Sequence, residues 1–250
     1  MMDYSIADNV VAFSTERYCT DASVPYDGFN ITHYSGDSPE HVHSCRLQLC
    51  RQLGISDDHL ILPRQVHGTR IREVTTENLN NTFEDTDALI THLPSVCIGV
   101  STADCVPLLF YDKRAEAVAA AHAGWRGTVA RIGTQTLRTM RDAYGCVPSE
   151  VKCIVGPSIG PNAFEVGDEV YVAFAHAGFP MNEIAFHAHK TQKWHIDLWR
   201  ANVWQLTQAG MLEENVHVSG ICTYTDYSHF FSARRLGIKS GRIFSGIMIK

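Results

Sequence analysis

The segment AVAAAHAGWRG, residues 117–127, ends a run of small apolar residues in a histidine, a tryptophan and an arginine. The length and composition of the apolar run predict a buried strand with His122 at its carboxyl end. Gly124 and Gly127 flank the Trp-Arg pair and allow a tight turn and a close backbone approach. Side chains at such strand ends project into the loops where α/β sheets bind ligands. His122 is therefore a candidate for metal binding or catalysis.

Two other segments carry a metal-binding side chain at a predicted strand end. STADC ends one strand-like run with Asp104 and Cys105. PRQVHG ends another with Arg64 and His67. Zinc and copper both accept histidine nitrogen and cysteine sulfur, but these residues are far apart in the sequence, so only the fold can bring them together. Each of them is also compatible with a purely structural role, as a hydrogen-bonded histidine or a core cysteine.

Arginines near the same segments are candidates for anion binding. The apolar pattern changes to helical spacing near Thr128, so Arg126 lies just before a predicted helix whose first amides favour an anion. Arg234 lies in FFSARR, where a guanidinium beside aromatic rings suits an anionic or heterocyclic ligand, although a solvated face is the simpler interpretation. GPSIGP, residues 156–161, lacks the lysine and the spacing of a P-loop and predicts a turn from strand to helix.

Two His-x-His pairs are poor ligand candidates. His41 and His43 fall on the predicted helix PEHVHSCRLQLCRQLG, where side chains two residues apart point in different directions. His187 and His189 lie in the polar stretch HAHKTQKWH, which predicts a solvated loop.

The elements that position the candidate residues are strands and helices in irregular alternation. Because strands cluster in consecutive runs, the sequence predicts an α+β fold, a mixed-sheet α/β sandwich decorated with helices, in one domain over residues 1–250. The strand candidates are VVAFST, LILPRQVH, DALITH, VCIGVSTAD, VPLLFYD, AVAAAHA, VKCIVGP, HVSGICTYT and RIFSGIMI. Further helix candidates are GDEVYVAFAHAG and IDLWRANVWQLTQAG.

The composition is that of an ordinary globular protein, with 45% hydrophobic and 19% charged residues and a net charge of −6. The basic residues are scattered, which argues against a nucleic-acid partner. The sequence shows neither a membrane-spanning apolar run nor a signal peptide, and these features predict a cytoplasmic protein without a membrane partner. Its eight cysteines include no C-x-x-C pair and are predicted to be reduced.

In this order, the segments PRQVHG, DALIT, STADCVPLLFYD, AVAAAHAGWRGTVARI, GPSIGP, KWHIDLW, ICTY and FFSARR resemble the laccase-domain family. That family was formerly called multicopper polyphenol oxidases and is described as zinc-dependent purine nucleoside phosphorylases. The resemblance covers nearly the whole chain and implies a zinc site with His67, Cys105 and His122 as ligands and catalytic residues. One segment departs from the pattern: FSTERYCTDASVPYDGFN stands where the family usually carries S-T-R-x-G-G-V-S.

The resemblance also implies the reactions. A His₂Cys set leaves a fourth tetrahedral position open, and zinc-bound water can ionise near neutrality and deaminate adenosine. Phosphorolysis would release the base from adenosine, inosine, guanosine or methylthioadenosine, with the nucleoside and phosphate as small-molecule partners. We expect Arg64, Arg126 and Arg234 to bind the substrates, and Asp104 to support the site or carry a proton.

Three alternatives stay open at this point. Cys105 with His122 as its base would suit a hydrolase or editing enzyme acting on peptidoglycan precursors. A copper polyphenol oxidase needs several coppers and more His-x-His pairs than this chain offers, so copper is the less favoured metal. The pocket could also bind a nucleoside without turnover. No feature of the sequence predicts the preferred nucleoside or the oligomeric state.

Overall fold

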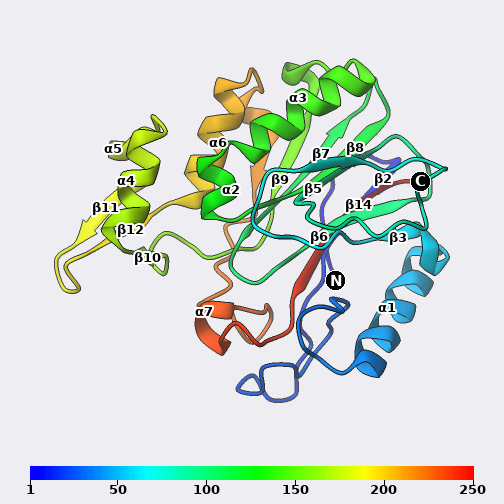
Figure 1. Cartoon of the computed structure of the whole chain (residues 1–250), viewed down its shortest axis with the longest axis horizontal. Coiled ribbons are helices and arrows are strands. Elements are labelled where there is room, and N and C mark those ends of the chain that lie inside the picture. Colours follow the sequence, from blue (N-terminus) through cyan, green and yellow to red (C-terminus); the bar gives the residue numbers. More distant parts are fainter.

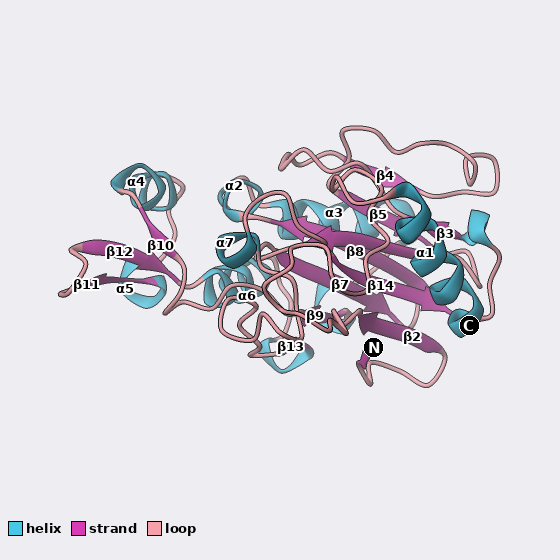
Figure 2. Cartoon of the chain, turned by 90° about the horizontal axis from the view of Figure 1, so that it is seen from below, coloured by secondary structure: helices cyan, strands magenta, loops and turns pink.

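The computed structural model describes residues 1–250 and shows three β-sheets and seven helices (Figure 1). Two sheets stack face to face, helices cover their outer faces, and the third sheet belongs to a lobe at one end of the molecule (Figure 2). The predicted α+β fold with mixed sheets is confirmed. None of the helices combines the length and the apolar character needed to cross a membrane.

The first sheet has five strands in the order β1-β2-β14-β6-β3. All neighbours pair antiparallel except β3, which runs parallel to β6. The bounds are β1 Met2–Asp3, β2 Val10–Ser14, β3 Leu60–Ile61, β6 Cys97–Thr102 and β14 Ile243–Ile249.

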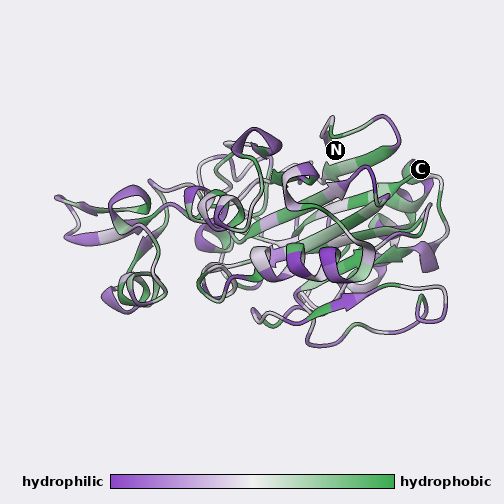
Figure 3. Ribbon diagram, turned by 90° about the horizontal axis from the view of Figure 1, so that it is seen from above, coloured by the Kyte–Doolittle hydropathy of each residue, from purple (hydrophilic) through white to green (hydrophobic).

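The second sheet has six strands in the order β13-β9-β7-β8-β5-β4, with the hairpin β7-β8 at its centre. Along β7, Leu108 and Phe110 face the helices, whereas Leu109 and Tyr111 face the first sheet. Both faces of this hairpin are therefore buried, which explains its continuous apolar sequence (Figure 3). The bounds are β4 Ile71–Glu73, β5 Ala88–Thr91, β7 Val106–Asp112, β8 Ala117–Ala123, β9 Lys152–Val155 and β13 Val216–Val218.

Helices cover both outer faces of the sandwich. Helix α1 lies on the first sheet through Cys45 and Leu49, while α3 and α6 lie on the second through Leu137 and Leu206. The bounds are α1 Pro39–Leu53, α2 Trp125–Val129, α3 Ile132–Tyr144, α4 Asp168–His176, α5 Met181–Ile184, α6 Leu198–Gln208 and α7 Ala233–Leu236.

The helix predicted from Thr128 is instead two helices. The short α2 begins at Trp125, and the chain breaks at Arg131, which has a left-handed φ of 65°, before α3 begins. The Arg131 guanidinium lies 3.8 Å from the centre of the Phe179 ring and donates a hydrogen bond to the carbonyl of Ala177. These contacts hold the break in place, so the predicted start at Thr128 was wrong by one turn.

The stretch HAHKTQKWH forms a hairpin, and its prediction as a solvated loop was wrong. Strands β11 Ala185–Ala188 and β12 Lys193–Ile196 pair antiparallel, and β10 Glu165–Val166 joins β12 on the other edge. Trp194 stacks on Tyr171 of α4 at a ring distance of 3.9 Å. This aromatic contact gives a polar hairpin a surface to pack against.

Three further predictions were wrong in extent. The strand in LILPRQVH ends at Ile61, so His67 lies in the loop that follows and not at a strand end. In place of a strand over HVSGICTYT, residues 217–225, the structure has only the three-residue β13, Val216–Val218. GPSIGP leads from β9 into β10 and not into a helix.

Candidate metal centre

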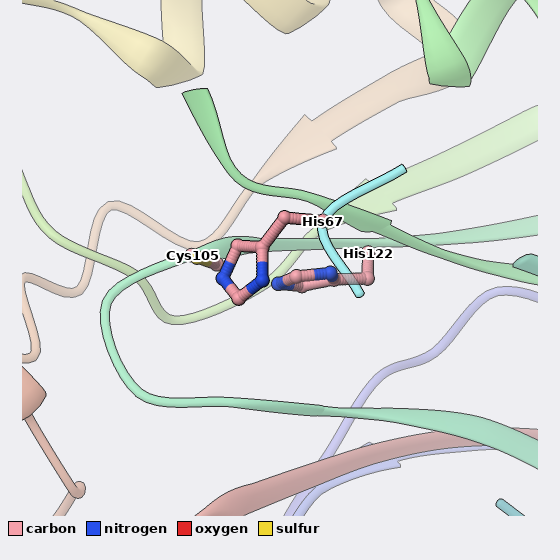
Figure 4. Close-up of side chains that lie close together, drawn as sticks. All are labelled: His67, Cys105 and His122. Atoms are coloured by element: carbon pink, nitrogen blue, oxygen red, sulfur yellow. The ribbon is translucent and has the colours of Figure 1, made fainter. Parts of the chain in front are cut away.

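The structure brings His67, Cys105 and His122 together at one end of the second sheet. One side-chain ligand atom from each residue lies within 4.8 Å of the other two, and the side chains converge in Figure 4. His122 is near the end of β8, and Cys105 directly precedes β7, whose Val106 pairs with Ala123. The hairpin register therefore places Cys105 beside the end of β8.

His67 reaches this point from the loop between β3 and β4. Its ring centre lies 4.7 Å from that of His122, and the two rings are nearly perpendicular. His67 is exposed, Cys105 is half-buried and His122 is buried. The three side chains thus form a small cluster that is closed behind His122 and open to solvent on the His67 side.

A buried carboxylate lies behind the two histidines. Asp87, directly before β5, accepts a hydrogen bond of 2.8 Å from Nδ1 of His122. The same carboxylate accepts from the backbone N–H groups of Val66, His67 and Gly68. Sequence reasoning did not single out Asp87 as a site residue, although it is the first residue of DALIT, one of the predicted strand segments.

Gly124 allows the backbone after β8 to approach the cluster closely. A Cβ atom at this position would lie 2.9 Å from Sγ of Cys105 and 3.2 Å from Cδ2 of His67. Both distances are shorter than ordinary van der Waals contacts. The close backbone approach that the sequence predicted at Gly124 is therefore required by the site.

The three groups have coupled electrostatics. Burial raises the pKa of the Cys105 thiol, but the charge of His122 and the hydrogen bonds from His122 and His67 outweigh burial and lower the pKa to about 6. Burial lowers the pKa of His122, but the Cys105 thiolate and the hydrogen bond to Asp87 raise it to about 9. Without a metal, the two groups form a thiolate-imidazolium pair near neutral pH.

These residues fit a bound metal ion. Two imidazole nitrogens and one thiolate suit zinc or copper, and three protein ligands leave a coordination position free, as in catalytic zinc sites. The hydrogen bond from His122 to Asp87 matches the support that metal-binding histidines usually receive.

Asp104, predicted to support the site or carry a proton, connects the centre with the C-terminal segment. Its Oδ1 accepts a hydrogen bond of 2.7 Å from Oγ1 of Thr223, and its Oδ2 accepts one of 2.6 Å from the backbone of Arg234. The Arg234 guanidinium donates to the carbonyl of Glu165, 3.2 Å away, and lies over the Phe164 ring. Asp104, the residue directly before Cys105, therefore anchors the start of α7.

The other two predicted substrate-binding arginines lie in different surroundings. Arg126 is the second residue of α2, and its exposed guanidinium lies 4.3 Å from the centre of the Trp125 ring. It has no carboxylate at ion-pair distance. The Arg64 side chain is 60% exposed and lies 3.7 Å from the carboxylate of Glu84. Neither arginine forms a hydrogen bond or ion pair with the three cluster residues.

The sequence is similar to curated enzymes over nearly its whole length. It is 44% identical to a purine nucleoside phosphorylase of Bacteroides thetaiotaomicron, with 96% of this chain and 92% of the relative covered. It is 42% identical to adenosine deaminase RL5 from an unknown prokaryotic organism, with 97% and 95% covered.

Solved structures with similar folds include YfiH of Bacillus licheniformis, described as a hypothetical protein, and YlmD of Geobacillus stearothermophilus. Each is 28% identical to this chain with a TM-score of 0.90. The first match covers 96% of this chain and 93% of the other, and the second covers 99% and 94%. The family profile described as multi-copper polyphenol oxidoreductase laccase matches residues 11–250. The chain therefore belongs to this laccase-domain family, as its sequence motifs predicted.

Proposed function

We propose that this enzyme is a zinc-dependent purine nucleoside phosphorylase that also deaminates adenosine. The observation that carries the proposal is the convergence of His67, Cys105 and His122 on one point in a chain similar to a phosphorylase and a deaminase. Zinc held by these residues would supply a Lewis acid with a free coordination position.

The protein must also bind an anion, because phosphorolysis joins phosphate to C1′ of the ribose while the purine leaves with the bond electrons and takes up a proton. Arg126 is our first candidate for the phosphate contact. Its guanidinium has no carboxylate partner, and its helix begins directly after Gly124, which borders Cys105 and His67. Arg64 is a weaker candidate because Glu84 lies beside it.

Arg234 is proposed as a further substrate-binding residue. Its position depends on Asp104, which holds the backbone of Arg234 and directly precedes Cys105. Of the two roles predicted for Asp104, support of the site is the one that this geometry favours.

The test is chromatography of reactions that contain the purified zinc-loaded protein and adenosine, inosine or guanosine, with and without phosphate. We expect release of the free base only when phosphate is present, and conversion of adenosine to inosine in either condition. Chelator treatment and the Cys105→Ala variant should remove both activities. Failure of the zinc-loaded protein to convert any of these nucleosides would refute the proposal.

A cysteine hydrolase is the second candidate, because the pKa of Cys105 near 6 is typical of an activated thiol. The two candidates respond oppositely to metal removal. A thiolate bound to zinc is a poor nucleophile, so a chelator should abolish phosphorolysis but preserve or increase hydrolysis by Cys105. Activity toward a peptidoglycan precursor that survives the chelator would favour the hydrolase.

A further inference from the structure

We propose that Asp87 is the positioning residue of the metal centre and that its single buried carboxylate fixes the positions of both histidine ligands. This inference rests on the proposed metal centre, but it concerns a residue that does not itself bind the metal. It is carried by four hydrogen bonds that converge on a side chain with no exposed surface.

On one side, Asp87 holds the loop that carries His67. The N–H groups of Val66, His67 and Gly68 all point at its two oxygens, at distances of 3.2, 2.9 and 2.8 Å. His67 has a φ of 61°, in the left-handed region that residues other than glycine adopt infrequently. Successive N–H groups in such a conformation form a concave anion-binding nest. The carboxylate fills this nest and stabilises the unfavourable turn that directs His67 toward Cys105.

On the other side, Asp87 orients His122. Nδ1 carries the proton that it donates in the 2.8 Å hydrogen bond to Asp87. Nε2 is therefore the ring nitrogen that can bind a metal. A backbone hydrogen bond joins the same two residues: the N–H of His122 donates to the carbonyl of Asp87 at 2.7 Å. The imidazole is therefore fixed in both its tautomer and its direction.

A carboxylate suits this position because all four groups that contact it are hydrogen-bond donors and need an acceptor. Two oxygens offer about four acceptor positions, and four N–H groups use them. Asparagine has nearly the same shape but replaces one oxygen with an NH₂ group, which would face N–H donors. Asp87→Asn should therefore weaken the nest or the bond to His122 without creating a cavity.

The first experiment compares Asp87→Asn with a matched control. Asp112 is also buried, at the opposite end of β7, and its Oδ1 accepts from the backbone of Arg114 and Ala115. Zinc affinity is measured by competition with a chromophoric chelator. We expect Asp87→Asn to weaken zinc binding about 10- to 100-fold, the usual effect of losing such a partner, and Asp112→Asn to leave it unchanged. Wild-type affinity in Asp87→Asn, or equal losses in both variants, would overturn the proposal.

The second experiment needs no variant and covers the case in which Asp87→Asn fails to fold. Nitrogen NMR of the zinc-loaded wild-type protein identifies which ring nitrogen of His122 carries a proton. We expect a protonated Nδ1 that exchanges slowly and a metal-bound Nε2. Metal coordination through Nδ1 would refute the role of Asp87. Neither measurement depends on turnover, so the proposed phosphorylase activity can fail independently.

Discussion

Replacement of Gly124 by alanine tests whether the backbone after β8 is part of the metal centre. Gly124 has φ −63° and ψ 171°, which alanine adopts without strain, so the effect comes from the added methyl group. That carbon would lie 2.9 Å from Sγ of Cys105, and ordinary contacts begin at 3.4 Å. The sulfur or the backbone must therefore move by about 0.5 Å, whereas zinc sites tolerate deviations of only about 0.2 Å. Overpacking of this kind costs about 1–3 kcal/mol, which corresponds to about 5- to 150-fold weaker zinc binding.

The assay is zinc competition with a chromophoric chelator, and Gly68→Ala is the control. Gly68 also lies beside the cluster and its N–H donates to Asp87, but alanine keeps this N–H, and the added methyl group meets nothing closer than Oδ2 of Asp87 at 3.4 Å. We expect zinc affinity within about twofold of wild type for this control, as its contacts are ordinary ones. Gly124 also caps α2, so the melting temperature of the zinc-free variants separates a helix effect from a metal effect. Unchanged affinity in Gly124→Ala, or an equal loss in Gly68→Ala, would show that this reasoning is wrong.

Three further predictions concern the cluster and its surroundings. Cys105→Ala should abolish zinc binding, measured by elemental analysis. Circular dichroism should show a retained fold, because the thiol is half-buried at the edge of the core. Full zinc occupancy would contradict the ligand assignment. Arg126→Ala should lower kcat/KM for phosphorolysis about 10- to 150-fold, since a charge-assisted hydrogen bond contributes about 1.5–3 kcal/mol. Deamination should fall less, and the zinc content should stay intact. Equal losses in both reactions would indicate a role in binding the nucleoside. In the zinc-free protein, the alkylation rate of Cys105 is measured by mass spectrometry of its peptide. This rate should rise as the pH increases through about 6 and then level off, because the thiolate is the form present above the lowered pKa of Cys105. His122→Ala should move that midpoint upward by removing the imidazolium, and an unmoved midpoint would contradict the pairing.

The central strands of the fold could be predicted because they are buried on both faces and read as continuous apolar runs. The helix break at Arg131 could not, since Ile132, Leu137 and Met140 keep the helical spacing beyond it. The break depends on Phe179 and Ala177, which are distant in the sequence. The hairpin in HAHKTQKWH escaped prediction for a similar reason, because its packing partner Tyr171 lies on another element.

The three candidate metal ligands could be predicted because histidine and cysteine next to turns are informative by type alone. Bringing them together required the family resemblance or the fold. Asp87 was missed because three of its four partners are backbone N–H groups, which leave no trace in the sequence. The bonds from Thr223 and Arg234 to Asp104 likewise join segments from opposite halves of the chain.

The charged groups around the proposed metal centre would suit a divalent cation. The buried Asp87 carboxylate and the Cys105 thiolate both lie beside the His122 imidazolium, which balances only one of these two negative charges. Because the hydrogen bond from Nδ1 to Asp87 is kept, a metal need displace only the second imidazole proton of His122. A zinc ion in place of this proton would be balanced by the carboxylate and the thiolate. The adjacent position would therefore carry little net charge, and an anionic substrate could approach it without the repulsion that a second carboxylate would impose.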